Sequence, residues 1–296
     1  MTGVQTCALP IWAKKKNIPL VFTWHTLYDR YAHFAPIVSE KFAAWWSIRN
    51  AVKYANRANQ VIVPTESVKK IIENWGVANA NIEAVLTGVE EEIFQNSDRE
   101  MMRKRLGIVE GEIALLLLSR LTAEKNVRFL VESVIEILKK NKKIKFILAG
   151  DGSELQILKK MISVENLFGQ VIFQGVVKNE IKKNIFAAAD IFVYASISET
   201  QGMIISEAMF SGLPVVAVEA TGIRDMVRDG ETGILTAENG KDFQEAIQKL
   251  IDDDNLRKTF SQKAGEIARE NYTSRICAQK MLEVYEQNIK GNKIVI

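Results

Sequence analysis

Short apolar runs alternate with amphipathic segments along the chain from Asn17 onward. The runs are apolar throughout instead of alternating with polar residues, which is typical of strands in parallel sheets buried on both faces. Nine runs are predicted to be strands: Pro19–Thr23, Gln60–Pro64, Ile82–Leu86, Ala114–Leu118, Lys145–Ala149, Val171–Gln174, Ile191–Ala195, Pro214–Val218 and Ile234–Thr236.

Helical periodicity fills most of the intervals between these runs. Thr65, before the first such interval, is a residue type that caps helix N-termini. The chain ends in three helical segments with no further strand. Strands that alternate with helices in this way predict an α/β fold of doubly wound parallel sheets. The predicted helices are Glu66–Trp75, Arg128–Lys140, Glu154–Val164, Lys178–Ala188, Ile204–Ser211 and Lys241–Asp252.

A polar stretch, Gly88–Asp98, divides the pattern into two parts. Six predicted strands follow it, enough for a complete doubly wound domain over residues 99–275. Three predicted strands precede it, so residues 12–98 are expected to form a partial domain of the same class. We expect the last helix, residues 276–296, to pack back toward the N-terminal domain.

The first eleven residues, MTGVQTCALPI, do not belong to this pattern. They lack the basic start of a signal peptide. They resemble the translation of a short-read sequencing adapter, which matches at every position after Met1. We therefore expect residues 1–11 to be non-natural, Cys7 to be no native cysteine, and the natural chain to begin earlier.

Composition excludes several classes of protein. The chain is 47% apolar and 25% charged, which suits a folded core and not a disordered chain. No apolar run reaches the roughly 18 residues of a membrane-spanning helix. A net charge of +3 is too weak to predict nucleic-acid binding. Two cysteines and two histidines, without ligand spacing, predict neither a disulfide framework nor a metal site.

The segment from Trp12 to Gln60 differs from the rest of the chain. It carries a local charge of +6 and four of the five tryptophans: Trp12, Trp24, Trp45 and Trp46. Tryptophan and lysine together favour a membrane interface. A solvated helix with a buried aromatic side accounts for the same residues, so both interpretations stay open.

One candidate site is the loop Ser119–Asn126, which follows a predicted buried strand and precedes a helix. Doubly wound folds bind ligands at the carboxyl ends of their strands. Arg120 and Lys125, two cations beside a helix N-terminus, suit a diphosphate. A pair of unrelated surface cations is the alternative.

A second candidate site contains two glutamates, Glu199 and Glu207, on either side of Gly202. Gly202 allows a close approach of backbone to ligand. The amides of Met203 and Ile204 open the next helix and can donate to phosphate or sugar oxygens. Glu207 lies among apolar helix residues and needs a partner, which a ribose diol could supply. A glutamate tolerated by the helix dipole is the alternative.

Three further features of the sequence are candidates for a function. His25 follows the first predicted strand, a position that favours a functional over a structural histidine. Gly150-Asp151-Gly152 resembles half of a dinucleotide fingerprint, but Leu155 replaces the third glycine, so a tight turn explains it. Asp252–Asp254 formally matches a D-x-D metal motif, yet it follows no strand and reads as a helix junction.

Together these residues resemble the family 4 retaining glycosyltransferases of the GT-B architecture, which has two Rossmann-like domains. The Ser119–Asn126 loop, the E-x7-E pair, the G-D-G turn and the D-G-E-T-G stretch Asp229–Gly233 carry the resemblance. It implies an N-terminal acceptor domain, here without its opening units, and a C-terminal donor domain. Many members have paired glycines where this chain has Ala220-Thr221-Gly222, so the contacts of that loop stay open.

The resemblance also implies roles for individual residues. Arg120 and Lys125 would hold the donor diphosphate, Glu199 would contact the donor sugar, and Glu207 would hold the ribose. Gly202, Met203 and Ile204 complete the expected donor site. His25 matches a histidine near the transferred sugar, so His25 and Glu199 are the candidate catalytic residues.

A narrower resemblance concerns the acceptor. The stretch His25–Phe34 is similar to the H-T-x-Y-x-x-Y-x-H-Y segment of bacterial diacylglycerol glucosyltransferases. It implies transfer of a hexose, expected to be glucose from UDP-glucose, to a membrane lipid at the cytoplasmic face of the cell membrane. We expect no metal and no cofactor. A GDP-mannose or other nucleotide-sugar transferase with a soluble or polysaccharide acceptor stays open, and so, more remotely, does a non-enzymatic nucleotide- or lipid-binding protein. A third alternative concerns this chain alone: as a truncated fragment it would bind the donor and transfer nothing.

Overall fold

The computed structural model describes residues 11–13, 15–30 and 39–291. The chain folds as two compact units, one of residues Met1–Thr87 with Arg275–Ile296 and one of residues Gly88–Ser274. Nearly all of the adapter-like head, and residues 31–34 of the lipid-transferase-like stretch, lie outside the described residues.

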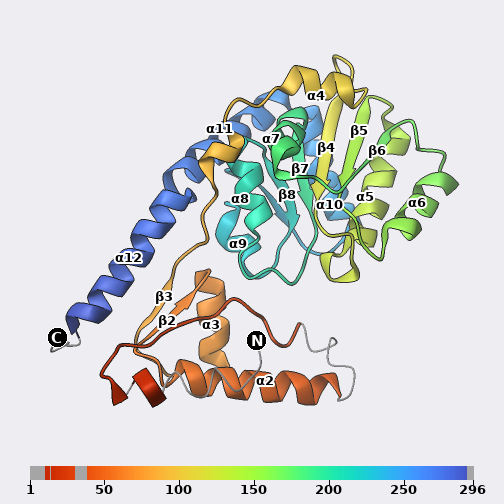
Figure 1. The fold of residues 1–296 in the computed structure, drawn as a ribbon. Coiled ribbons are helices and arrows are strands. Elements are labelled where there is room, and N and C mark those ends of the chain that lie inside the picture. Colours follow the sequence, from red (N-terminus) through yellow and green to blue (C-terminus); the bar gives the residue numbers. More distant parts are fainter. Residues whose placement is uncertain (1–10, 14, 31–38, 292–296) are drawn as a thin grey trace. The chain divides into compact units, whose positions relative to one another are not determined.

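The first unit is built on a three-stranded parallel sheet (Figure 1). Helices join its successive strands, and the Thr65 hydroxyl caps the second of them by accepting a hydrogen bond from the Val68 amide at 3.4 Å. The elements along the chain are β1 (Val21–Thr23), α2 (Glu40–Ala55), β2 (Gln60–Val63), α3 (Glu66–Asn74) and β3 (Ile82–Ala84).

Trp24 lies at the centre of the first unit's core, with 1% of its surface exposed. Its ring contacts those of Phe22, Tyr28 and Trp75 at centroid distances of 5.8–5.9 Å. Trp24 therefore stabilises the fold and cannot face a membrane. The hypothesis that the four tryptophans of this segment lie at a membrane interface is wrong for Trp24. The other three are each more than half exposed: Trp12, Trp45 and Trp46.

The last helix, α12 (Ser274–Gly291), supplies core residues to the first unit. Val284 is 1% exposed and packs with Ile62 of β2 and Val85. The Asn288 amide also donates to the Gln60 side-chain oxygen at 3.4 Å. This unit is therefore assembled from both ends of the chain.

The second unit contains a six-stranded parallel sheet in the order β6-β5-β4-β7-β8-β9. This order has a switch point between β4 and β7, where the chain reverses its direction across the sheet. The predicted doubly wound domain is therefore confirmed. The strands are β4 (Ile113–Leu118), β5 (Ile144–Ala149), β6 (Val171–Gly175), β7 (Ile191–Tyr194), β8 (Val215–Val218) and β9 (Gly233–Thr236).

Helices cover both faces of this sheet (Figure 1). Three pairs of these helices pack against each other: α5 with α10, α8 with α11, and α4 with α7. The helices are α4 (Arg99–Arg105), α5 (Val127–Lys140), α6 (Leu155–Val164), α7 (Asn179–Ala188), α8 (Met203–Phe210), α9 (Ile223–Met226), α10 (Gly240–Asp252) and α11 (Asp254–Asn271). Two short 3₁₀ turns precede α4 and α5: η2 (Glu91–Phe94) and η3 (Ala123–Lys125).

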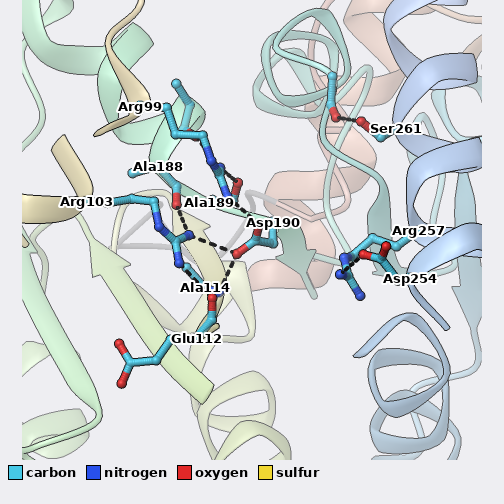
Figure 2. A network of polar contacts seen from close by, with 12 residues as sticks. Arg99, Arg103, Glu112, Ala114, Ala188, Ala189, Asp190, Asp254, Arg257 and Ser261 are labelled. Atoms are coloured by element: carbon cyan, nitrogen blue, oxygen red, sulfur yellow. Dashed lines mark hydrogen bonds and ion pairs between the residues drawn. The ribbon is translucent and has the colours of Figure 1, made fainter. Parts of the chain in front are cut away.

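The second unit begins at Gly88, not near Arg99 as the polar stretch suggested. Phe94 explains the difference, because its ring lies 5.9 Å from Phe186 and 5.7 Å from Phe210. Arg99 then anchors α4, donating to Asp190 Oδ1 at 2.6 Å and to the Ala189 carbonyl at 2.7 Å (Figure 2). One aromatic anchor and one arginine thus attach a polar segment to the second unit.

Candidate functional site

Two loops meet at the switch point of the six-stranded sheet, one after β4 and one after β7. The Lys125 ammonium, on the first loop, donates a short hydrogen bond to Glu199 Oε1 on the second. Both side chains are mostly buried, at 12% and 15% exposure. The structure therefore brings together two predicted site residues that are 74 positions apart.

Glu199 has a second partner that the sequence did not reveal. The Tyr194 hydroxyl donates to the same Oε1 at 2.6 Å. Burial alone would raise the pKa of Glu199, but the Lys125 cation and hydrogen bonds from Lys125, Tyr194 and Ser196 lower it below its usual value. The site thus holds an ionised carboxylate at the strand ends.

Arg120 extends from the β4 loop with a 63% exposed side chain. Its guanidinium Nη2 lies 3.4 Å from Glu124 Oε1. Burial opposes ionisation of Glu124, but backbone and Thr122 hydrogen bonds and the charges of Arg120 and Lys125 lower its pKa. Both cations of the loop therefore have a carboxylate partner, which an incoming anion would compete with.

The Gly150-Asp151-Gly152 turn supports the loop that carries the cations. The Leu121 amide donates to the Asp151 carbonyl at 2.8 Å. A side chain at Gly150 would overlap the carbonyl oxygen of Ser119, and one at Gly152 would overlap that of Leu121. The glycines are therefore needed for the approach of two backbones, consistent with the predicted tight turn.

Asn126 closes the same loop in the left-handed conformation, with φ 52°. Asparagine tolerates this conformation better than most residues. Its side-chain amide donates to Glu238 Oε1 at 2.8 Å, on the loop after β9. This hydrogen bond thus joins the β4 loop to the loop that follows the edge strand β9.

The start of α8 lies against Glu199. Gly202 precedes the helix with φ 78°, and a side chain there would lie 3.9 Å from Glu199 Cγ. The helix begins at Met203, one residue before the predicted start. As at the start of any α-helix, the amides of Met203 and Ile204 have no intrahelical acceptor, and Gly202 has no side chain that could cap them. They are suited to an anion.

Glu207 has a lysine partner on another helix. The Lys182 ammonium, on α7, lies 2.9 Å from Oε1 and 3.2 Å from Oε2 of Glu207. The partner that the sequence required for Glu207 is therefore present within the chain. No sequence spacing could reveal it, because the two residues lie on separate helices 25 positions apart.

Comparison with protein families shows which family the chain belongs to. Residues 98–266, more than half of the chain, match the family described as "Glycosyl transferases group 1". This chain is a group 1 glycosyltransferase. Residues 3–93 match a second family, "Glycosyltransferase Family 4".

Curated relatives of this glycosyltransferase include two enzymes with the same name. Alpha-monoglucosyldiacylglycerol synthase of Streptococcus pneumoniae (strain ATCC BAA-255 / R6) is 32% identical over 282 residues, covering 90% of this chain and 62% of the relative. The enzyme of that name from Acholeplasma laidlawii is 30% identical over 299 residues, covering 95% and 72%. The chain therefore spans less than two thirds of the first of these relatives.

A solved structure of similar fold is that of Anabaena HepE. Its complex with UDP has a TM-score of 0.84 and 24% identity, covering 97% of this chain and 77% of HepE. Its complex with UDP-glucose has a TM-score of 0.80. The predicted GT-B fold, with parallel sheets in two α/β units, is confirmed.

His25 belongs to the first unit of the glycosyltransferase, whereas the donor-site candidates all lie in the second. It follows β1 by two residues, after the buried Trp24, so it lies at the carboxyl end of a parallel strand as expected. Much of the residue is exposed, but partial burial of the imidazole disfavours its charged form and lowers its pKa below the usual value. Its role near the sugar stays a prediction.

Within the part of the glycosyltransferase that the structure describes, none of the helices is both long and apolar enough to cross a bilayer. The Asp252–Asp254 stretch is a helix junction, because Asp253 caps α11 by accepting from the Leu256 amide at 2.9 Å. Asp254 lies 2.5 Å from both Arg257 Nη2 and Lys258 Nζ.

Proposed function

We propose that this glycosyltransferase moves glucose from UDP-glucose to a membrane lipid such as diacylglycerol, with retention of configuration. The observation that carries the proposal is the meeting of Lys125 and Glu199 at the strand ends, beside the first amides of α8. Cations and helix amides suit a diphosphate, and a carboxylate suits sugar hydroxyls. The names of two relatives at about 30% identity support glucose and a diacylglycerol lipid.

In the proposed reaction the bond between the anomeric carbon and the diphosphate oxygen breaks, and UDP leaves. The acceptor hydroxyl oxygen bonds to the anomeric carbon on the same face, and its proton passes to the leaving phosphate. Arg120, Lys125 and the amides of Met203 and Ile204 offset the charge that develops on the diphosphate. No metal ion takes part in this proposal.

The remaining candidates have roles outside the diphosphate. Glu199 accepts hydrogen bonds from the sugar hydroxyls, and Glu207 accepts from the ribose. His25, on the acceptor unit, would lie near the transferred sugar. Each of these substrate contacts is inferred from the place of the residue in the fold.

A lipid acceptor implies work at a membrane surface, and helix α2 suits an anionic one. Phe42, Trp45 and Trp46 are 51–58% exposed on it. Arg49 and Lys53 follow at helical spacing on the same side, and the Arg49 guanidinium lies 5.5 Å from the Trp45 ring centroid. Aromatic rings at the headgroup level and cations near anionic lipids would hold the enzyme on the inner face of the cell membrane.

Calorimetric titration and a transfer assay test the proposal. The chain should bind UDP and UDP-glucose more tightly than GDP or GDP-mannose, and should transfer radiolabelled glucose to diacylglycerol in vesicles. Changing Arg120→Ala or Lys125→Ala should lower the transfer rate on the order of 10²-fold or more. Arg105→Ala, an exposed arginine on α4, is the control. Unchanged turnover in both site variants contradicts the proposal, and a preference for GDP-mannose assigns the alternative donor.

A further inference from the structure

Tyr194 is the last residue of β7, at the switch point of the sheet. Only 2% of it is exposed. Its ring stacks on Phe192, two residues earlier on the same face of the strand, at 5.9 Å and an interplanar angle of 22°. Phe192 in turn contacts Phe186 of α7 at 6.0 Å. Packing therefore fixes the direction in which the Tyr194 hydroxyl points.

That hydroxyl points at a carboxylate which otherwise depends on two loops. Glu199 lies five residues after Tyr194, beyond the end of the strand, and Lys125 reaches it from the β4 loop. Loops are more mobile than the strands they connect. Tyr194 is therefore the partner of Glu199 that the sheet itself holds in place, through a 2.6 Å hydrogen bond to a charged acceptor.

We infer that Tyr194 is a positioning residue for the donor sugar: it fixes the Glu199 carboxylate where that group accepts the sugar hydroxyls. The inference rests on the proposed function, which assigns Glu199 to the sugar. Because Tyr194 acts through Glu199, its loss should weaken recognition of the hexose and leave recognition of the nucleotide intact. A purely structural tyrosine would affect both equally.

Tyr194→Phe removes one oxygen atom and keeps the ring. In calorimetric titrations at pH 7, this variant should bind UDP within twofold of the wild type. Its affinity for UDP-glucose relative to UDP should fall about tenfold, the loss expected for one hydrogen bond to a charged group. Tyr272→Phe is the matched control in the same unit, since Tyr272 is 6% exposed and its hydroxyl donates to the Met226 carbonyl at 3.2 Å.

A double-mutant cycle separates positioning from structure. In a Glu199→Gln background, Tyr194→Phe should have little further effect on the affinity ratio, because the charged acceptor is already gone. An undiminished effect in that background, an unchanged ratio in Tyr194→Phe, or an equal loss in Tyr272→Phe overturns the inference. If Tyr194→Phe melts well below Tyr272→Phe, Tyr194→Met replaces it in the same cycle. Failure of the wild-type chain to bind UDP-glucose contradicts the proposed function instead.

Discussion

The Lys182 ammonium lies within hydrogen-bond distance of both carboxylate oxygens of Glu207, 2.9 Å from one and 3.2 Å from the other. Both side chains are mostly buried, at 17% and 16% exposure. The ion pair joins α7 to α8 and sets the direction of the carboxylate that we propose for the ribose.

Replacing Lys182 should therefore weaken nucleotide binding through Glu207. Lys182→Met keeps the length of the side chain but leaves the carboxylate without its cation. We expect UDP affinity to fall about tenfold and the preference for UDP over 2′-deoxy-UDP to shrink. The neighbouring Lys183, which donates to the Gln95 carbonyl at 2.7 Å, gives the control Lys183→Met. An unchanged preference for the ribose would separate Lys182 from this role.

A side chain at Gly150 should displace the cation-bearing loop. Gly150→Ala adds a Cβ that overlaps the Ser119 carbonyl, in a backbone conformation with φ 134°. We expect a loss of about 2–4 kcal/mol in the free energy of unfolding, together with weaker UDP binding. Gly111→Ala isolates the backbone strain, because Gly111 also has positive φ but open space around it. It should cost about 1 kcal/mol, and equal losses in urea denaturation would contradict the explanation.

Asp190 should be a stabilising residue of the second unit. Its carboxylate accepts from Arg99 at 2.6 Å, from Arg103 at 3.1 Å and from the Ala114 amide at 2.8 Å (Figure 2). Asp190→Ala leaves three donors without that acceptor and should cost about 3 kcal/mol in urea denaturation. Asp254→Ala removes a carboxylate that is 55% exposed and pairs with Arg257 and Lys258, and should cost much less than Asp190→Ala because water screens exposed ion pairs. Similar losses in both variants would mean that burial does not decide the effect.

Glu199 should make stability depend on pH in a defined direction. Its pKa in the folded chain is lowered, so its unfolded-state value, about 4.3, is the higher of the two. The ionised group therefore contributes stability above about pH 4.3, and this contribution is lost as pH falls through the folded-state pKa. The difference in unfolding free energy between wild type and Glu199→Gln should shrink in that acidic range. A difference independent of pH would exclude an ionised Glu199.

The exposed cations of α2 should govern attachment to vesicles. Changing Lys41, Arg49 and Lys53 to Glu should weaken co-sedimentation with anionic vesicles, since each basic residue near such a surface contributes about 1 kcal/mol. UDP affinity should stay the same, because the donor candidates lie in the other unit. The control changes three exposed lysines of the second unit to Glu: Lys104, Lys241 and Lys258. Equal recovery with anionic and neutral vesicles would favour a soluble acceptor.

The sequence alone was sufficient for the order of the strands and for the expectation that the loops of Lys125 and Glu199 meet. Unbroken apolar runs are visible in a sequence because a strand buried on both faces admits few polar residues. Lys125 and Glu199 could be predicted as neighbours because the carboxyl ends of parallel strands share one edge of a sheet. These are local signals, each contained in one stretch of the chain.

The partners of those residues were decided by tertiary structure alone. In the sequence, Tyr194 resembles any other apolar residue of a buried strand, and Lys182 resembles a solvated lysine of a helix. Only the packed structure shows that their polar atoms contact Glu199 and Glu207, respectively. Likewise, composition grouped Trp24 with the exposed tryptophans of the basic segment, and only its burial in the structure shows that it is a core residue. A hydrogen bond or ion pair forms between the polar ends of two side chains, at a distance of about 3 Å. Sequence periodicity predicts only on which face of a helix or strand each side chain lies, so it cannot identify the partner.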